Sequence, residues 1–94
     1  MQMGSINMYV YLLESIATGW RYIGQTQDLT ARLTRHNSGK EKSTKRYAPF
    51  RLLGYIEVAD RKSAYRLEQS LKALKLREYQ FRYFVEHGIM VDDT

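Results

Sequence analysis

The feature that most constrains the fold is a pair of short runs rich in aromatic and β-branched residues near the N-terminus. The first run is MYVYLL at residues 8–13, and the second is WRYIG at residues 20–24. Runs of this composition favour β-strands, and the intervening ESIATG supplies the polar residues and the glycine of a turn. We therefore predict an antiparallel hairpin in which Tyr11 and Tyr22 can lie close together, with a register that the sequence does not determine.

One further strand and three helices are predicted after the hairpin. Asp28 and Asp60 each precede a segment with apolar residues at helical spacing, and both suit a helix N-cap. Gly88 ends the last helical segment. The predicted elements are helices over residues 29–37, 61–75 and 78–87, a basic loop over residues 39–50 and a strand over residues 51–58.

The predicted order is β-β-α-β-α-α, which indicates an α+β domain with a small three-stranded antiparallel sheet flanked by helices. With 94 residues the chain has room for one hydrophobic core. In the third strand, strict alternation places Leu52 and Ile56 on one face and Leu53 on the other. We assign residues 1–7 to an irregular N-terminal extension, residues 8–88 to a single domain and residues 89–94 to a C-terminal tail.

Composition excludes several classes of function. The chain has no cysteine and two histidines, which leaves no ligand set for a zinc finger and no thiol nucleophile. No phosphate-binding or dinucleotide glycine motif is present, and no apolar run approaches the ~20 residues of a membrane span. The absence of cysteine fits a reducing compartment, so we expect a cytoplasmic protein.

The charge of the chain favours an anionic partner. The 15 Lys and Arg residues exceed the 10 Asp and Glu residues, which gives a formal charge of +5 and a pI near 9.6. Nucleic acid is the first candidate, although a domain can also be basic without such a partner. Five cations in and beside the central loop are expected to contact backbone phosphates without reading bases: Lys40, Lys42, Lys45, Arg46 and Arg51. The alternative is a solvated loop with no binding role.

Three side chains on the predicted helices suit chemistry at a phosphate. Arg32 and His36 lie four residues apart and so share one face of their helix. A guanidinium binds a phosphate through two hydrogen bonds, and an imidazole donates a hydrogen bond or moves a proton. Glu68 borders the apolar stripe of its helix, where a carboxylate can ligate Mg²⁺ or pair with Lys72. Spacing alone favours the simpler alternatives, a solvated basic face for the first pair and an ion pair for Glu68.

Five segments, taken in order, resemble the GIY-YIG nuclease domain. YVY at residues 9–11 stands where that family has GIY, and YIG at residues 22–24 matches as written. DLTARLTRHN resembles the family's helix with an arginine and a His-Asn pair. STKRYAPFRLL and RKSAYRLEQSLKALK resemble the region that carries the family's glutamate. The likeness runs from about Met8 to Lys75 and is greatest to short, single-domain bacterial members.

The resemblance implies a metal-dependent DNA endonuclease with one divalent ion, Mg²⁺ or Mn²⁺, and little sequence preference. Position by position, the family's site residues correspond to Tyr11, Tyr22, Arg32, His36 and Glu68. In the implied mechanism Glu68 binds the metal, Tyr11 is the general base and Arg32 stabilises charge on the phosphate. Tyr22 and His36 position the phosphate or the water. Since a phenol has a pKa near ~10, this role requires a cation such as Arg32 beside Tyr11.

Two positions depart from the family pattern, and a second hypothesis stays open. Tyr9 replaces the glycine of GIY, and Gln25 stands where several active members have a lysine. If that lysine assists the base, its loss lowers activity. The second hypothesis is therefore a catalytically weak or inactive basic module that binds nucleic acid with the same fold. DNA is the expected partner, with RNA also open, and the sequence does not identify a protein that recruits the domain.

Overall fold

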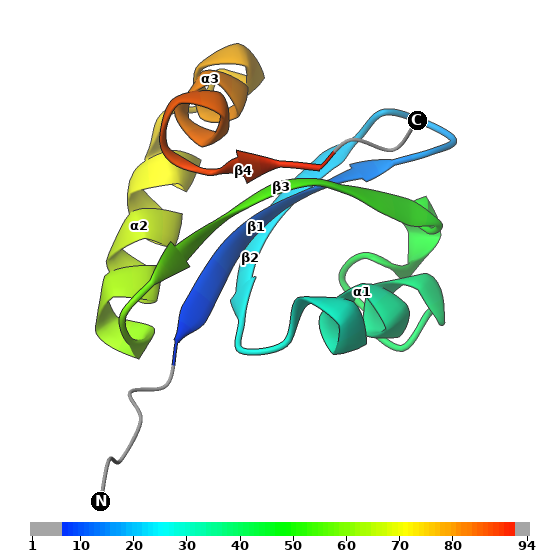
Figure 1. The fold of residues 1–94 in the computed structure, drawn as a ribbon. Coiled ribbons are helices and arrows are strands. Elements are labelled where there is room, and N and C mark those ends of the chain that lie inside the picture. The colour runs from blue at the N-terminus through cyan, green and yellow to red at the C-terminus, as the bar shows by residue number, and fades with distance from the viewer. Residues whose placement is uncertain (1–6, 92–94) are drawn as a thin grey trace, which may run out of the picture.

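The computed structural model describes residues 7–91, which form a four-stranded antiparallel sheet with three α-helices (Figure 1). The strand order is β2-β1-β3-β4, so β2 and β4 are the edge strands. The elements are β1 Met8–Ser15, β2 Arg21–Thr26, α1 Leu29–Asn37, the 3₁₀ turn η1 Lys45–Tyr47, β3 Phe50–Val58, α2 Arg61–Ala73, α3 Arg77–His87 and β4 Ile89–Met90. No helix within this described part of the chain is long and apolar enough to cross a membrane.

Both aspartates predicted as N-caps, Asp28 and Asp60, are confirmed in that role. Asp28 Oδ1 accepts a hydrogen bond from the backbone N–H of Ala31 at 3.0 Å, and Asp60 Oδ1 accepts one from the N–H of Ser63 at 2.8 Å. Each bond satisfies an N–H group that the first helical turn leaves without an internal partner. The local sequence therefore sets where α1 and α2 begin, and so where their functional side chains fall.

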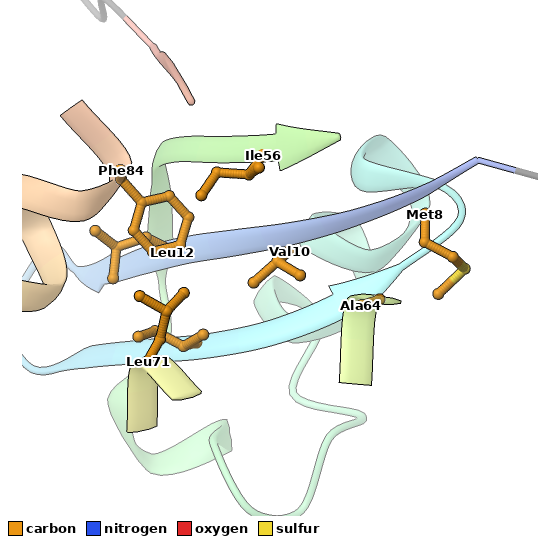
Figure 2. Packing of buried hydrophobic residues seen from close by; sticks show 8 residues of the cluster. Met8, Val10, Leu12, Ile56, Ala64, Leu71 and Phe84 are labelled. Atoms are coloured by element: carbon orange, nitrogen blue, oxygen red, sulfur yellow. The ribbon is translucent and has the colours of Figure 1, made fainter. Parts of the chain in front are cut away.

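The two faces of the sheet are covered by different helices. α2 and α3 lie against one face, and α1 lies against the other (Figure 1). The buried cluster under α2 and α3, most of which Figure 2 labels, consists of Met8, Val10, Leu12, Ile23, Ile56, Ala64, Leu71 and Phe84. The buried residues on the α1 side are Tyr11, Leu13 and Phe50. Alternation along β1 thus sends its odd-numbered residues Tyr11 and Leu13 toward α1.

The prediction of three strands is wrong, because a fourth strand follows α3. β4 pairs antiparallel with the middle of β3. A Cβ on Gly88 would lie 2.5 Å from the carbonyl oxygen of Tyr55, so the missing side chain lets the returning chain pass close to β3. A two-residue strand has no alternation for a sequence pattern to reveal. The predicted C-terminal tail therefore begins with a strand, while residues 1–6 and 92–94 lie outside the described residues.

β3 contains a β-bulge that changes which of its residues share a face. The register between β1 and β3 shifts between Leu12 and Leu13, and Leu53 has no partner on β1. Strict alternation is therefore wrong for this strand. Leu53 and Ile56 both pack in the cluster under α2 and α3, whereas Leu52 packs on the α1 side.

The α3 helix is expected to be held mainly by Phe84, which is fully buried among the residues of Figure 2. We predict that Phe84→Ala lowers the free energy of unfolding by about 3–5 kcal/mol, because truncation leaves a cavity. Val85 is 51% exposed, so Val85→Ala is expected to change it by less than ~0.5 kcal/mol. Urea denaturation followed by circular dichroism measures both variants. Similar losses for the two variants would contradict the packing of α3.

Candidate active site

The ring of Tyr11 lies over Gly24, and this close approach organises the site. Tyr11 on β1 is paired with Gly24 on the edge strand β2. A Cβ at position 24 would lie 2.5 Å from the Tyr11 hydroxyl and 2.8 Å from a ring carbon of Tyr22. Any side chain there would displace both rings, so the arrangement requires a glycine. The two ring centres are 6.3 Å apart, so the tyrosines do lie close together across the hairpin.

His36 connects Tyr11 to the central loop through a buried chain of hydrogen bonds. Its Nε2 lies 3.0 Å from the Tyr11 hydroxyl, and its Nδ1 lies 2.8 Å from Thr44 Oγ1. The Thr44 hydroxyl donates in turn to the carbonyl oxygen of Glu41 at 3.5 Å. Thr44 Oγ1 is then the acceptor for the Nδ1–H group, which leaves Nε2 to accept the hydrogen bond from Tyr11. Tyr11, His36 and Thr44 are each at most 2% exposed.

Asn37 fixes the end of α1 against β3. Its side-chain nitrogen donates to the carbonyl oxygen of Phe50 at 3.1 Å, and its side-chain oxygen accepts from the N–H of Phe50 at 2.6 Å. Phe50 itself is 2% exposed and so is not available to stack on a base. The adjacent His36 and Asn37 therefore have different roles, since His36 meets Tyr11 and Asn37 holds the helix in place.

Burial keeps both members of the Tyr11–His36 pair neutral at pH 7. Desolvation and the neighbouring Tyr22 raise the pKa of the Tyr11 phenol, and they outweigh the charge and hydrogen bond of Arg32, which lower it. Desolvation also lowers the pKa of His36 below 6.5, against the opposing charge of Glu41. The cation expected beside Tyr11 is present, but an ionised phenol is not the resting form of the site.

Glu68 reaches the same region from α2, around the edge of the sheet formed by β2. Its side chain is 12% exposed, and its carboxylate accepts a hydrogen bond from Gln25 Nε2 at 2.9 Å and pairs with Lys72 Nζ at 2.6 Å. The Lys72 amine also lies 5.7 Å from the centre of the Tyr22 ring. The charge of Glu68 contributes to the raised pKa of Tyr11. The ion pair considered from the sequence is thus present, and it lies beside both tyrosines.

The site offers a metal ion one carboxylate. Residues 7–91 contain no group of three or more His, Asp or Glu side chains placed to hold a metal. Mg²⁺ keeps much of its hydration and is often bound by one or two carboxylates together with substrate phosphate. Glu68 therefore fits an ion that binds together with nucleic acid. The Lys72 side chain is 44% exposed and can rotate away from the carboxylate.

A model of the GIY-YIG catalytic domain matches residues 7–81, which include both tyrosines, α1 and Glu68. The chain belongs to the GIY-YIG family. The UPF0213 protein BH0048 of Halalkalibacterium halodurans is 38% identical over 74 residues, which is 78% of each chain. The UPF0213 protein SpyM50708 of Streptococcus pyogenes is 41% identical over 81 residues, which is 84% of this chain and 86% of the relative. The solution NMR structure of BH0048 from Bacillus halodurans has a TM-score of 0.50 at 36% identity and covers 82% of each chain.

Two residues that contact the candidate site, Gln25 and Thr44, are not among the site residues predicted from the sequence. Gln25 follows the YIG segment and links β2 to Glu68 on α2. The alternation of β2 could have placed Gln25 on the face opposite Tyr22, which is the face against which α2 packs. Thr44 has no such signal, since only the path of the loop after α1 brings its hydroxyl to His36.

The fold separates the five loop cations predicted to bind nucleic acid. Arg51 pairs with Glu14 at 2.8 Å near the end of β1. Lys40 lines a groove that also contains Arg32 of the candidate site. The other three, Lys42, Lys45 and Arg46, are exposed on the loop. Lys40 thus shares a surface with a predicted site residue, and phosphate contact by all five cations stays a prediction.

The buried His36 makes the stability of the domain depend on pH. Because the pKa of His36 is below 6.5 in the folded state, the unfolded chain binds its proton more readily, and the free energy of unfolding is expected to fall as the pH decreases below about 6.5. Glu14 and Glu41, whose pKa values are lowered from 4.5, lose their contribution only in more acidic solution.

Urea denaturation at a series of pH values measures this dependence. His36→Gln is expected to remove the loss of stability that begins near pH ~6.5. His87→Gln, at the exposed end of α3, is expected to behave as the wild type. The same pH dependence in wild type and His36→Gln would contradict a neutral, buried imidazole.

Proposed function

We propose that this GIY-YIG domain hydrolyses phosphodiester bonds of DNA with one divalent metal ion, Mg²⁺ or Mn²⁺, and with little sequence preference. The observation that carries the proposal is the buried chain Tyr11–His36–Thr44 with Arg32 beside it. A phenol that donates to a neutral imidazole can take a proton from water, and a neighbouring guanidinium can stabilise the phosphate. Membership of the family supports nuclease chemistry.

His36 allows Tyr11 to act as a base although the pKa of its phenol is raised. As water attacks the phosphorus, its proton moves to the Tyr11 oxygen while the phenolic proton moves to His36 Nε2, across the 3.0 Å hydrogen bond. The new P–O bond forms and the bond to the leaving oxygen breaks. Ionised Tyr11 is not required, because the imidazole receives the proton. Thr44 binds the Nδ1–H group and so keeps Nε2 ready to accept.

Arg32 and Tyr22 supply polar groups for the phosphate. Arg32 lies one turn before His36 on α1 and close to Tyr11, with which it lines a small cavity. Its N–H groups can bind phosphoryl oxygens, where charge increases in the transition state. Tyr22 is half-buried and therefore more accessible than Tyr11. We assign Arg32 to charge stabilisation and Tyr22 to positioning the phosphate.

Glu68 is the residue that would hold the metal ion. When bound, the ion supplies Lewis-acid stabilisation of the phosphate and of the leaving oxygen. Gln25 orients the carboxylate from β2, and Lys72 balances its charge in the metal-free protein. Gln25 therefore supports the ligand here, rather than supplying the cation that the family pattern has at this position.

Two observations favour a second candidate function, a basic module that binds nucleic acid with weak or no catalysis. Tyr11 is 2% exposed, which restricts the approach of water. Both oxygens of Glu68 already have partners, and a metal ion must displace the amine of Lys72. The two candidates share the fold and the charge, so cleavage decides between them.

Wild-type protein with Mg²⁺ or Mn²⁺ is expected to nick supercoiled plasmid, and Glu68→Gln is expected to slow nicking by on the order of 10²-fold. The amide has no charge with which to hold the ion, whereas binding of DNA should persist. Glu86→Gln removes the same charge from an exposed position on α3 and is expected to nick at the wild-type rate.

The assay uses duplex, single-stranded and branched DNA and RNA, each with metal ion or with EDTA. Equal nicking by wild type and Glu68→Gln would indicate a contaminating nuclease and would end the assignment of Glu68. Binding of these substrates without cleavage by the wild type would favour the second candidate.

Tyr11→Phe is expected to stay folded, with about 1–3 kcal/mol less free energy of unfolding because His36 Nε2 loses its partner, and to lose cleavage by on the order of 10²-fold or more, because the proton-accepting hydroxyl is removed. Tyr9→Phe is the matched control, since Tyr9 lies on the same strand and packs edge-on against Tyr55 with ring centres 5.8 Å apart. The control is expected to cleave normally. Cleavage by Tyr11→Phe at the wild-type rate would remove Tyr11 from the role of the base.

A further inference from the structure

A groove at one end of the sheet carries cations from three segments of the chain. Its volume is about 590 Å³, and it lies between the end of β2, α1 and the start of α2. Arg32 lies on α1, Lys40 lies in the turn that follows α1, and Arg61 is the first residue of α2. In Figure 1 this is the end of the sheet where β1 begins and β2 finishes.

These three cations have no carboxylate partner among the described residues. Arg35 also lines the groove, but it is paired with Glu41. The single carboxylate in the lining belongs to Asp28, which is engaged as the cap of α1. The groove therefore has an excess of positive charge, which attracts anions.

The rest of the lining favours contact with a phosphate backbone. No aromatic side chain lines the groove, so it offers no ring on which a base can stack. Neutral donors such as Gln25 and Gln27 lie among the cations, and such groups, with Lys and Arg, are those that bind phosphate and sugar oxygens. The lining is thus suited to the sugar-phosphate backbone of a nucleic acid rather than to its bases.

The groove is continuous with the candidate active site. Arg32 lines the groove and also lies against Tyr11, with which it lines a small cavity, while Gln25 lines the groove and is hydrogen-bonded to Glu68. A ligand with several phosphates can therefore reach from the site to Arg61.

We propose that this groove binds the sugar-phosphate backbone of the substrate strand next to the reacting phosphate, with Lys40 and Arg61 contacting neighbouring phosphates. The inference rests on the proposed nucleic-acid substrate and adds Arg61 to the residues that bind it. It also supplies a physical reason for weak sequence preference, since contacts to the backbone position a strand without reading its bases.

The experiment measures binding in EDTA, so that no substrate is cleaved. The groove variant is Lys40→Glu/Arg61→Glu, and the control variant is Lys75→Glu/Arg82→Glu. The two variants have the same net charge, and all four positions are exposed. Fluorescence anisotropy with a labelled duplex and with its single strand is recorded over a range of KCl concentrations.

The groove variant is expected to bind on the order of tenfold more weakly than the control variant at low salt. Log K falls as log salt concentration rises, and this negative slope is expected to become less steep by about two, one for each phosphate that the groove variant no longer binds. The control variant should keep the wild-type slope, because its charges lie on and next to α3, outside the groove.

Equal affinities and equal slopes for the groove and control variants would overturn the inference and leave the proposed function in place. Failure of the wild type to bind any of the nucleic acids would overturn the proposed function, and this inference with it. Lys40→Gln/Arg61→Gln removes the charges without reversing them, and it is expected to give the same change of slope. Urea denaturation checks that all variants are folded.

Discussion

The packing of the Tyr11 ring over Gly24 is the contact on which the candidate site depends. Since position 24 has no side chain, the phenol lies across the edge strand and its hydroxyl meets His36 at 3.0 Å. This geometry also requires that α1 hold one position against β3, which the two hydrogen bonds between Asn37 and Phe50 ensure. One buried phenol thus couples the hairpin, α1 and the start of β3.

Each polar side chain in the buried chain Tyr11–His36–Thr44 has a hydrogen-bond partner. No buried side-chain nitrogen or oxygen in the described part of the chain lacks a hydrogen-bond partner. An unsatisfied buried group would cost about 1–3 kcal/mol, so the buried ring of His36 needs the partner that the Thr44 hydroxyl supplies to its Nδ1. Glu68 approaches the site from the other face of the sheet. Its carboxylate can lie near the tyrosines because β2 is an edge strand, with no further strand beside it to separate the two faces.

Most of the fold could be predicted from local patterns, and its two irregularities could not. The aspartate caps and the aromatic strands depend on contacts within a turn or between neighbouring strands, so their signals are local. The bulge at Leu53 depends on how the side chains of β3 divide between the two buried clusters. The strand after Gly88 depends on the pairing of the chain with β3 after α3. Nothing within a few residues of either position records those distant contacts.

The same distinction holds for the site. The sequence by itself determined that Arg32 and His36 share a helical face and that Tyr11 and Tyr22 lie on adjacent strands, because the first follows from the period of one helix and the second from a short turn between two neighbouring strands. Only the tertiary structure decided that Thr44 binds His36, that Gln25 holds Glu68 and that Arg61 lies in a groove with Arg32. Those pairs join residues from different elements, and their contact depends on how the helices pack against the sheet rather than on any local spacing.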